Sequence, residues 1–434
     1  MLPTRRSFLW TASAGGLISA MLREDGLSRV LAAVNDAGTT PAGDLARNED
    51  FWLQIQRAYD VDRSLINLNN GGVAPAPRSV LNTMYRHVDF TNNVPPRNLW
   101  SVLDLQVETV RVRLARAFGC DAEEIAIVRN ASEALQICLN GLDLKPGDEV
   151  LTTSHDYPRM INTLKQREQR EGIVLKTFPF ATPPKTLSEL AELFEKNVTP
   201  KTRVILVCHI TNLTGQIFPI RDIVRMGRQR GIEVIVDGAH SFAHFPFNHT
   251  DLDCDYYGTS LHKWLSAPIG TGFLYVRKSK IAGLWPLTAP PETRADNIRK
   301  FEEIGTHPTG PYLAVADALT LHESIGAERK GARLRYLRDD WAKRLVDRKG
   351  VAFHTSFDPA QSCGIGTIGI EGVHGMDLTT HLFNKHRIVV TPIKIDPIDG
   401  IRVTANTYTT PREIDIFVDA MTEVIEKGIP PATP

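Results

Sequence analysis

Short apolar runs rich in β-branched residues recur along the middle of the chain, between residues 124 and 277. Seven of them are long enough to be strands, and helical patterns separate most of them. Strands that are apolar at nearly every position are typical of parallel sheets with helices on both faces. The pattern therefore predicts an α/β domain with a mostly parallel seven-stranded sheet. The predicted strands occupy residues 123–130, 148–154, 173–180, 202–210, 233–240, 254–260 and 271–278.

The pattern changes after Thr306, where a helix-rich stretch begins and runs to about residue 350. Three strand candidates follow it, and together they predict a smaller α+β domain at the C-terminus. Nearer the N-terminus, helices are predicted over residues 45–65 and 101–118, with a Gly/Pro/Asn-rich loop at 68–77 between them. The C-terminal strand candidates are 366–369, 388–390 and 400–403. We divide the chain into a signal peptide (1–33), an N-terminal segment (34–66), a large domain (67–306) and a small domain (307–434).

The composition narrows the class of protein. The 434-residue chain is 42% hydrophobic and 23% charged, as globular proteins are, and its 50 basic residues balance 50 acidic ones. Nucleic-acid-binding proteins normally carry a basic excess or a basic stripe, so we set that class aside. The five cysteines form no CxxC pair and the histidines show no metal-ligand spacing, so neither a disulfide framework nor a metal site is expected. Gly-rich dinucleotide and P-loop motifs are missing.

The N-terminus carries an export pattern. The pair Arg5-Arg6 is followed by Ser-Phe-Leu and then by a weakly apolar stretch to Leu22. This stretch is shorter than the roughly 20 apolar residues that a transmembrane helix needs. This resembles a twin-arginine signal, and the small residues at 31–33 offer a cleavage site. We expect the twin-arginine export machinery to deliver the folded protein to the bacterial periplasm. The alternatives are an amphipathic N-terminal helix with a chance arginine pair, and an uncleaved anchor.

Two charged residues stand at the ends of predicted strands. Asp237 ends the run EVIVD, and Lys263 lies 26 positions later, just after the next run. Open α/β sheets bind their ligands at the carboxyl ends of their strands. A lysine there can form a Schiff base with an aldehyde cofactor, and an aspartate can pair with a protonated pyridine nitrogen.

The motifs around these two residues resemble the cofactor core of the class V aminotransferase superfamily, which are pyridoxal-phosphate enzymes of fold type I. Matching segments run in order from LNNGGVAPAP near residue 68 to IRVTANTYTTPREID near residue 415, about four fifths of the chain. The resemblance implies a fold type I transferase with pyridoxal 5'-phosphate as its cofactor. The chain is most similar to isopenicillin N epimerase-like proteins. Exported members of that group include a periplasmic enzyme that tailors the glutamyl side chain of the siderophore pyoverdine.

The resemblance also assigns roles to single residues. Lys263 would hold the cofactor and shuttle the substrate α-proton, and Asp237 would pair with the pyridinium. Tyr157 takes the position whose ring stacks on the pyridine, where the family often has histidine. Arg402 matches the arginine that binds the substrate α-carboxylate, and Asn70 would be a second substrate-binding residue.

Further cofactor contacts follow from the same resemblance. They are Ala131, Ser132 and Ser260 at the phosphate, His262 beside the lysine, Asn212 and His240 near the phenolic oxygen, and Thr306 at the phosphate of a neighbouring subunit. The last of these implies a homodimer with shared active sites.

Simpler interpretations stand beside these assignments. A lone lysine such as Lys263 is usually solvated, and a lone aspartate such as Asp237 is usually a helix cap. His155 competes for the position of the stacking ring. Arg294 and Arg299 compete for the role of the carboxylate-binding arginine. The joint occurrence of the motifs, in order, favours the functional interpretation.

The sequence constrains the reaction only in part, because pyridoxal phosphate supports several reactions of amino acids. No cysteine lies in VVTPIKIDPIDGIRV, ahead of the carboxylate-binding arginine, where a cysteine desulfurase needs one. We expect α-proton chemistry on an amino acid, peptide or siderophore. Transamination ranks ahead of epimerisation because no second acid is evident, and lyase chemistry is a further alternative. A non-catalytic binding protein on the same fold is disfavoured by the presence of Lys263.

Overall fold

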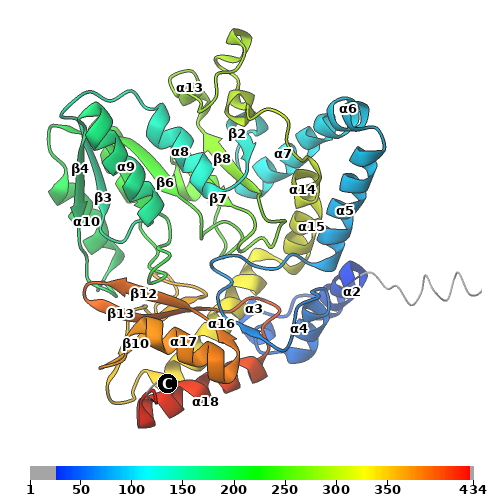
Figure 1. The fold of residues 1–434 in the computed structure, drawn as a ribbon, viewed down its shortest axis with the longest axis vertical. Coiled ribbons are helices and arrows are strands. Elements are labelled where there is room, and N and C mark those ends of the chain that lie inside the picture. The colour runs from blue at the N-terminus through cyan, green and yellow to red at the C-terminus, as the bar shows by residue number, and fades with distance from the viewer. Residues whose placement is uncertain (1–25, 431–434) are drawn as a thin grey trace, which may run out of the picture.

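A seven-stranded sheet lies at the centre of the larger part of the molecule (Figure 1), in a computed structural model that describes residues 26–430. Its strands are β2 (Ile125–Val128), β3 (Glu149–Thr153), β4 (Val174–Phe178), β5 (Thr202–Cys208), β6 (Glu233–Asp237), β7 (Tyr256–Ser260) and β8 (Gly272–Val276). They are ordered β2-β8-β7-β6-β5-β3-β4. Only β8 runs antiparallel to its neighbours. The predicted number of strands and the mostly parallel arrangement are confirmed.

Helices cover both faces of this sheet. In β6, Val234 and Val236 belong to one apolar core and Ile235 to the other, because successive side chains of a strand point to opposite faces. The helices of this part are α5 (Arg78–Asn93), α6 (Pro95–Asn98), α7 (Asp104–Phe118), α8 (Ala131–Gly141), α9 (Pro158–Glu171), α10 (Leu187–Asn197), α11 (Ile220–Gln229), α12 (His249–Leu252), α13 (Lys278–Ile281), α14 (Gly310–Leu313) and α15 (Val315–Ile325). The first core is closed by α7, α10, α11 and α15, and the second by α8 and α9.

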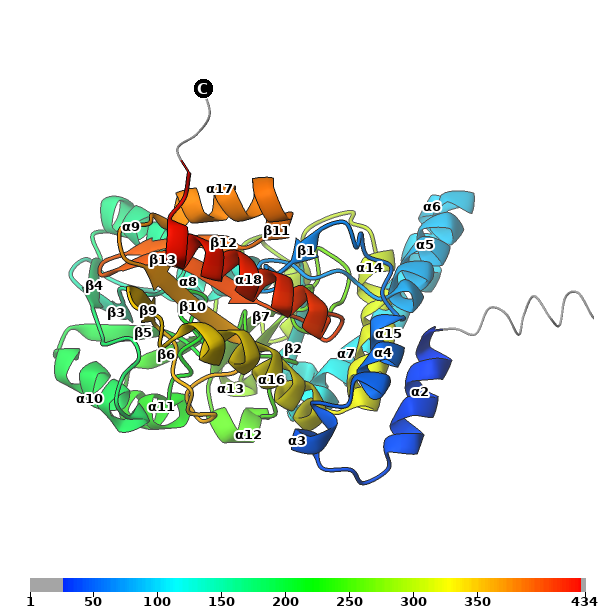
Figure 2. The ribbon, with the colours of Figure 1, turned by 90° about the horizontal axis from the view of Figure 1, so that it is seen from below.

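A smaller body packs below the large sheet in Figure 1 and faces the viewer in Figure 2. It contains β9 (Val351–Phe353), β10 (Ile365–Ile370), β12 (Thr391–Ile395), β13 (Ile398–Thr404), α16 (Ala327–Leu345), α17 (Gly375–His386) and α18 (Pro411–Lys427). Its antiparallel sheet has the order β12-β13-β10-β9. The N-terminal segment also joins this body, because β1 (Ile66–Asn67) pairs in parallel with β11 (Ile388–Val389). The small body is therefore built from both ends of the chain.

The helices predicted near the N-terminus form over shorter ranges. The first is α4 (Glu49–Gln56), which follows the short α3 (Ala42–Leu45). Beyond α4 the chain turns away, and the ring of Tyr59 packs 5.1 Å from that of Tyr408 in the small body. The second is α7, which follows a π-helical turn (Leu99–Leu103) and stops at Gly119 because that residue has a φ of 84°. Short 3-10 helices occur at Ala122–Glu124, Glu292–Arg294 and Ile298–Glu302.

The described chain begins with α2 (Gly26–Ala37), which packs against α4 and α15. Val30 on this helix is fully buried and shares a small core with Trp52. The predicted cleavage residues, 31–33, lie inside α2, so cleavage after Ala33 would remove a core residue. The arginine pair lies outside the described residues. Within residues 26–430, no helix has both the length and the apolar character needed to cross a membrane.

Candidate active site

Three parallel strands of the large sheet end side by side at the seam with the small body. Cys208 ends β5, Asp237 ends β6 and Ser260 ends β7. A cavity of about 510 Å³ opens there, within the size range of small-molecule sites. The predicted residues that line it are Ala131, Ser132, Tyr157, Asn212, Asp237, His240, Ser260, His262, Lys263 and Arg402. The fold thus gathers segments of the chain that are far apart in sequence around one hollow.

Lys263 and His240 are in direct contact in the cavity wall, with Lys263 Nζ 3.0 Å from His240 Nε2. Burial lowers the pKa of Lys263 to about 8, although the nearby Asp237 carboxylate acts in the opposite direction. Burial also holds the pKa of His240 well below its ordinary value, so its imidazole is neutral. A neutral imidazole can accept a hydrogen bond from the ammonium group, and the lowered pKa of Lys263 increases the share of free amine, which is the form that attacks an aldehyde.

Asp237 is a buried carboxylate that accepts a hydrogen bond from the backbone N–H of Ala239 at 2.9 Å. Burial raises the pKa of Asp237 to about 6; the negative charge of Asp156 raises it further, and Lys263 opposes the shift. A cation placed against a buried carboxylate stabilises its charged form. The environment of Asp237 therefore fits a protonated pyridine nitrogen.

The first turn of α8 forms another part of the wall. Asn130 caps this helix, and the backbone N–H of Ala131 donates to Ser260 Oγ at 2.9 Å. Gly272 allows β8 to pass close behind, because a Cβ there would lie 2.7 Å from Asn130 Cα. The N–H groups and the dipole of a helix N-terminus favour an anion, and Ser132 on the same turn adds a hydroxyl. This wall fits a phosphate.

Several buried polar atoms of the wall residues have no hydrogen-bond partner among the described residues. They are Asn212 Oδ1, His240 Nδ1, His262 Nδ1 and Arg402 Nε. An unpaired buried polar group costs about 1–3 kcal/mol, so such a concentration around one cavity indicates a polar ligand. Pyridoxal phosphate has a ring nitrogen, a phenolic oxygen, an aldehyde and a phosphate. The donors and acceptors present therefore fit this cofactor.

Tyr157 lies in the cavity wall directly before α9, whose first residue is Pro158. Its hydroxyl oxygen accepts a hydrogen bond from Arg159 Nε at 3.0 Å. The rival ring, His155, lies outside the wall and packs against Phe180 with 4.4 Å between ring centroids. Of the two candidates for the stacking ring, only Tyr157 faces the cavity.

Arg402 reaches the cavity from β13 of the small body. Its Nη1 donates to the backbone oxygen of Asn212 at 3.0 Å, and its Nη2 donates to Asn69 Oδ1 at 2.8 Å. Burial lowers the pKa of Arg402 to about 10, which leaves the guanidinium charged at neutral pH. With its Nε unpaired among the described residues, this buried cation can receive a carboxylate.

Asn70 does not have the predicted position. Its side chain is buried outside the wall, where Oδ1 accepts from the Tyr408 hydroxyl at 2.6 Å and Nδ2 donates to the Thr404 oxygen at 3.0 Å. These bonds tie the loop to the small body and leave the side chain nothing to offer a substrate. The neighbouring Asn69 lines the cavity instead. The position of Asn70 therefore does not support a role in substrate binding, and Asn69 is the residue that the loop presents to the cavity.

Thr306 and the two rival arginines also lie outside this cavity. Thr306 is exposed, on the loop that precedes α14. Arg299 pairs with Glu108 at 2.6 Å, and Arg294 lies 3.8 Å from Glu303. Both arginines thus belong to an ion-pair cluster on another surface, which leaves Arg402 as the carboxylate-binding candidate.

Besides Asn69, a cysteine and an arginine of the cavity wall were not predicted from the sequence. Cys208 lines the cavity and its thiol donates to Asp156 Oδ1 at 3.3 Å; Arg159 lies at the exposed end of the wall. The feature that could have indicated Cys208 is its position at the end of β5, where it pairs with Asp237 at the end of β6. Among residues 26–430, no group of three or more His, Cys, Asp or Glu side chains is placed to hold a metal ion.

Curated relatives include two kinds of enzyme. The chain is 29% identical over 395 residues to the isopenicillin N epimerase of Streptomyces clavuligerus, which covers 85% of this chain and 97% of that protein. It is 25% identical over 387 residues to a cysteine desulfurase of Salmonella agona, with 83% and 93% covered. Two different reactions are therefore represented among similar sequences.

Solved structures give the same fold. The cysteine desulfurase CsdA of Escherichia coli superposes with a TM-score of 0.74 at 20% identity and covers 86% of this chain and 98% of its own. A cystine C–S lyase in complex with cysteine persulfide gives a TM-score of 0.73 at 24% identity, with 83% and 98% covered. These likenesses establish a fold type I architecture. The sequence profile of class V aminotransferases matches residues 66–392, and the chain belongs to that family of pyridoxal-phosphate enzymes.

Proposed function

We propose that this protein holds pyridoxal phosphate on Lys263 and moves the α-proton of an amino-group substrate, with transamination as its reaction. The observation that carries the proposal is the 3.0 Å contact between Lys263 Nζ and His240 Nε2, in a cavity that Asp237 and Arg402 also line. An amine, a neutral base and a carboxylate-binding cation are thus held around one space.

Bound at this site, the cofactor supplies an electron-withdrawing ring that stabilises the charge left when the α-proton departs. The chain's own residues direct that chemistry. Arg402 fixes the substrate carboxylate and thereby orients the Cα–H bond. Lys263 accepts the proton at Nζ and returns it, burial keeps a share of that amine unprotonated, and the neutral His240 imidazole holds the amine by a hydrogen bond. Asp237 holds the proton on the ring nitrogen.

Epimerisation is the second candidate, and a specific observation favours it. Epimerisation needs a second proton donor besides Lys263, and the Tyr157 hydroxyl lines the same cavity, held by Arg159. The likeness to isopenicillin N epimerase supports the same alternative. Transamination ranks first because it needs only the lysine that the 3.0 Å contact with His240 prepares.

Sulfur abstraction, the chemistry named for the desulfurase relatives, lacks a suitable nucleophile here. Cys208 alone among the cysteines of the described chain lines the cavity. Burial holds the pKa of its thiol well above its ordinary value, and the thiol hydrogen is bound to Asp156. A thiol must become a thiolate to attack sulfur, so Cys208 is unsuited to that step.

We propose that the substrate carries a second anionic group beyond its α-carboxylate, as a glutamyl residue does on a peptide or siderophore. Arg159 lies at the exposed edge of the wall and contacts no carboxylate among the described residues. Its Nε is held by Tyr157, which leaves its two terminal nitrogens for a ligand. Two cations at different depths, Arg402 buried and Arg159 exposed, suit a substrate with two anionic groups.

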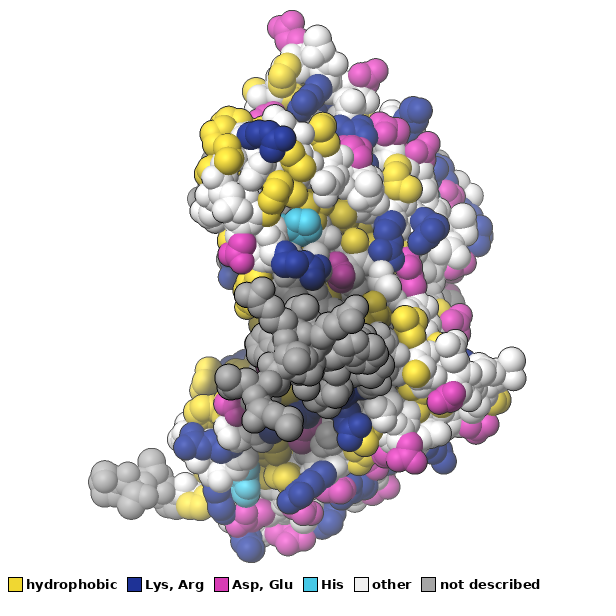
Figure 3. Space-filling view, turned by 90° about the vertical axis from the view of Figure 1, so that its right-hand side faces the viewer, with side chains coloured by type: hydrophobic (Ala, Val, Ile, Leu, Met, Phe, Trp, Pro, Cys, Tyr) yellow, Lys and Arg dark blue, Asp and Glu magenta, His cyan; other side chains and the backbone are white. Residues whose placement is uncertain are grey.

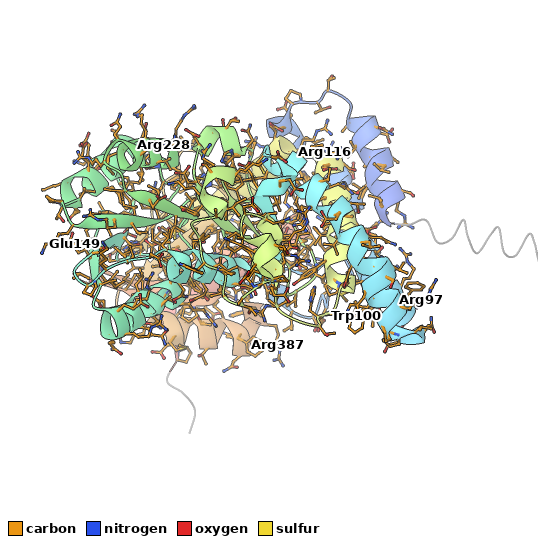
Figure 4. The ribbon with its side chains drawn as sticks, turned by 90° about the horizontal axis from the view of Figure 1, so that it is seen from above. Arg97, Trp100, Arg116, Glu149, Arg228 and Arg387 are labelled. Carbon is orange, nitrogen blue, oxygen red and sulfur yellow. The ribbon has the colours of Figure 1, made fainter. Side chains whose placement is uncertain are left out.

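We propose a homodimer in which the exposed Thr306 serves the neighbouring cavity. Helices α5 to α7 lie beside the loop that carries Thr306 and expose large apolar side chains, with Trp100 56% and Leu105 69% exposed. Figure 3 shows hydrophobic side chains on the upper half of this side of the molecule, and Figure 4 places Trp100 near Arg97 at the projecting end. An exposed apolar surface of this kind is typical of a protein interface. The other large apolar side chains here are Tyr85, Val88, Phe90, Val94 and Val112.

We also propose export to the periplasm by the twin-arginine route, on the basis of Arg5-Arg6 and the residues that follow. This route carries folded proteins, so the cofactor can be acquired before export. Because Val30 is completely buried, we propose that cleavage, where it occurs, falls ahead of α2 rather than after the predicted residue 33.

The reaction can be tested in deuterated water with a panel of amino acids and peptides that have a free amino terminus. We expect deuterium at the substrate α-carbon, an aminated cofactor and a keto product. Lys263→Ala should slow exchange by about 10²–10⁴-fold, because it removes the proton carrier. Lys165→Ala, at an exposed lysine, is the control. Inverted, labelled substrate without aminated cofactor would establish epimerisation instead, and release of alanine or sulfide would contradict both.

Substitution of the two arginines should separate their roles. Arg402→Gln should raise KM for every substrate by about 10–100-fold, because a buried charge-assisted hydrogen bond is lost. Arg159→Gln should raise KM about two- to five-fold, and only for substrates with a second carboxylate, since an exposed ion pair is weak. Steady-state kinetics with glutamyl and alanyl substrates measure both effects, with Arg170→Gln on α9 as control. Equal effects of Arg159→Gln on both substrates would exclude the second anionic subsite.

Shared active sites can be tested by mixing inactive chains. Lys263→Ala and Thr306→Ala chains should each be impaired alone. Their heterodimer should recover one intact site, because each chain then lends the other what it lacks. Activity after subunit exchange measures the recovery, and Trp100→Glu should shift the mass measured by light scattering toward the monomer. Failure of every mixture to recover activity would show that each site is complete within one chain.

Export can be tested by replacing Arg5 and Arg6 with lysine. The variant should accumulate in the cytoplasm, because the twin-arginine machinery requires the arginine pair, while the parent is recovered from the periplasm. Immunoblots of the two fractions give the result, and the mass of the periplasmic form locates its N-terminus. Equal periplasmic recovery of both proteins would rule out this route.

A further inference from the structure

Two aromatic rings lie stacked beside the catalytic pair. The imidazole of His244 and the indole of Trp264 are 3.6 Å apart between centroids, with only 4° between their planes. Both are fully buried. Trp264 directly follows Lys263, and His244 lies four residues after His240. The stack therefore connects the two backbone segments that carry the amine and the base.

Both nitrogens of His244 are engaged in bonds that fix its protonation. Nδ1 lies 2.8 Å from the backbone oxygen of His240, and Nε2 lies 2.9 Å from the backbone N–H of Gly364. A carbonyl only accepts and an N–H only donates, so Nδ1 carries the proton and Nε2 accepts. Burial holds the pKa of His244 well below its ordinary value, in agreement with this single neutral tautomer.

The partner of Nε2 belongs to the small body. Gly364 directly precedes β10, and a Cβ at that position would lie 3.0 Å from His244 Nε2 and 3.6 Å from the indole of Trp264. Even a methyl group would therefore press on the stack. Through this imidazole, the small body is connected to the backbone of His240.

Lys330 on α16 reaches the other half of the stack. Its buried amino group donates to the backbone oxygen of Trp264, no carboxylate pairs with it among the described residues, and burial lowers its pKa to about 7. A buried cation without a carboxylate is costly, so a solely structural need would be met better by an apolar side chain. Lys330 thus holds the peptide that follows Trp264, one residue beyond Lys263, as His244 holds the peptide that follows His240.

The backbone on both sides is strained. Ala243, just before His244, has a φ of 60°, and Ser266, two residues after Trp264, has a φ of 58°. Non-glycine residues rarely adopt this region, and such strain persists where surrounding contacts enforce it. The described chain has only four such residues, and these two flank the stack.

We propose that His244 and Lys330 are positioning residues, which fix the Lys263–His240 contact by locking the adjoining peptides to β10 and α16 of the small body. The seating of the small body then sets the distance between the amine and its base. The inference goes beyond the proposed reaction and rests on the assignment of Lys263 as the cofactor lysine.

Two substitutions at His244 separate positioning from packing. His244→Phe keeps a flat ring on Trp264 but loses the bond to His240. His244→Asn loses the ring but keeps an amide donor where Nδ1 stood. If His244 positions the Lys263–His240 pair, the phenylalanine variant should be the more stable and the less reactive of the two. If His244 serves only in packing, the more stable variant should also be the more reactive one.

Reactivity is measured without a known substrate, as the rate at which pyridoxal phosphate added to the apoprotein becomes trapped on Lys263 by borohydride. His244→Phe and Lys330→Met should slow trapping by about 10–100-fold, the effect of a small misplacement of reacting groups. They should also shift the pH midpoint of the visible cofactor band. Their double variant should be no slower than the slower single variant, because both act on the same pair.

Val424→Ala in α18 is the control, since Val424 is buried in the core of the small body and does not touch the stack. It should lower Tm by about 2–4 °C and leave trapping unchanged. Trapping at the parent rate in His244→Phe, with the same Tm loss as the control, would overturn the proposal. Absence of trapping on Lys263 in the unmodified protein would instead refute the cofactor assignment.

Discussion

Charged side chains lie at the interface between the large and the small body. The packing of the two bodies against each other is what buries them. Asp237 and Arg402 are buried and Lys263 is half-buried around one cavity. Each charge placed alone in such an environment would cost several kcal/mol. Neither body could bury them by itself, because Asp237 and Lys263 come from the large sheet and Arg402 from β13. The site therefore exists only when both bodies are folded and seated on one another.

The seam is held by the same groups that would meet the substrate. Arg402 donates to the backbone of Asn212 in the large body and to Asn69 in the N-terminal loop. The next residue of that loop, Asn70, binds Tyr408 and Thr404 and so fastens the loop to the small body. A carboxylate bound by Arg402 would add charge complementarity at this junction. Substrate binding and domain seating are then coupled by one guanidinium.

The large sheet was predictable because each of its strands is a local, nearly continuous apolar run, as in IAIV and TRVILVC. The strands of the small body were harder to predict. β1 and β9 are only two and three residues long, and β12 contains Pro392. The pairing of β1 with β11 joins residues more than 300 positions apart, which no local pattern indicates.

Residues of the site that have a distinctive chemical role could be predicted from the sequence. Residues that differ from a neighbour only in whether the side chain points into the cavity could not. Asp237 and Lys263 stand out by type and by their place at strand ends. Asn69 and Asn70 are identical in type and adjacent, so only the path of the loop decides which one faces the cavity. The same holds for Tyr157 and His155, two rings two positions apart, because only the fold decides which of them faces the cavity. Cys208 could not be recognised from the sequence because it ends an apolar strand and resembles a core residue.

The fold alone leaves the reaction open, since similar sequences include an epimerase and a desulfurase. The side chains beneath Asp237 narrow the choice. Cys208 stands in register with Asp237 and gives its hydrogen to Asp156, whose other oxygen accepts from Thr153 Oγ1 at 2.7 Å. The negative charge of Asp156 raises the pKa of Asp237, and the same charge would favour a protonated ring nitrogen placed against the Asp237 carboxylate. A firmly protonated ring withdraws electrons strongly, and strong withdrawal is what removal of an α-proton requires. The Cys208 thiol, which a desulfurase-type reaction would need as a nucleophile, instead donates its hydrogen to the carboxylate that acts on Asp237, in keeping with the proposed proton transfer.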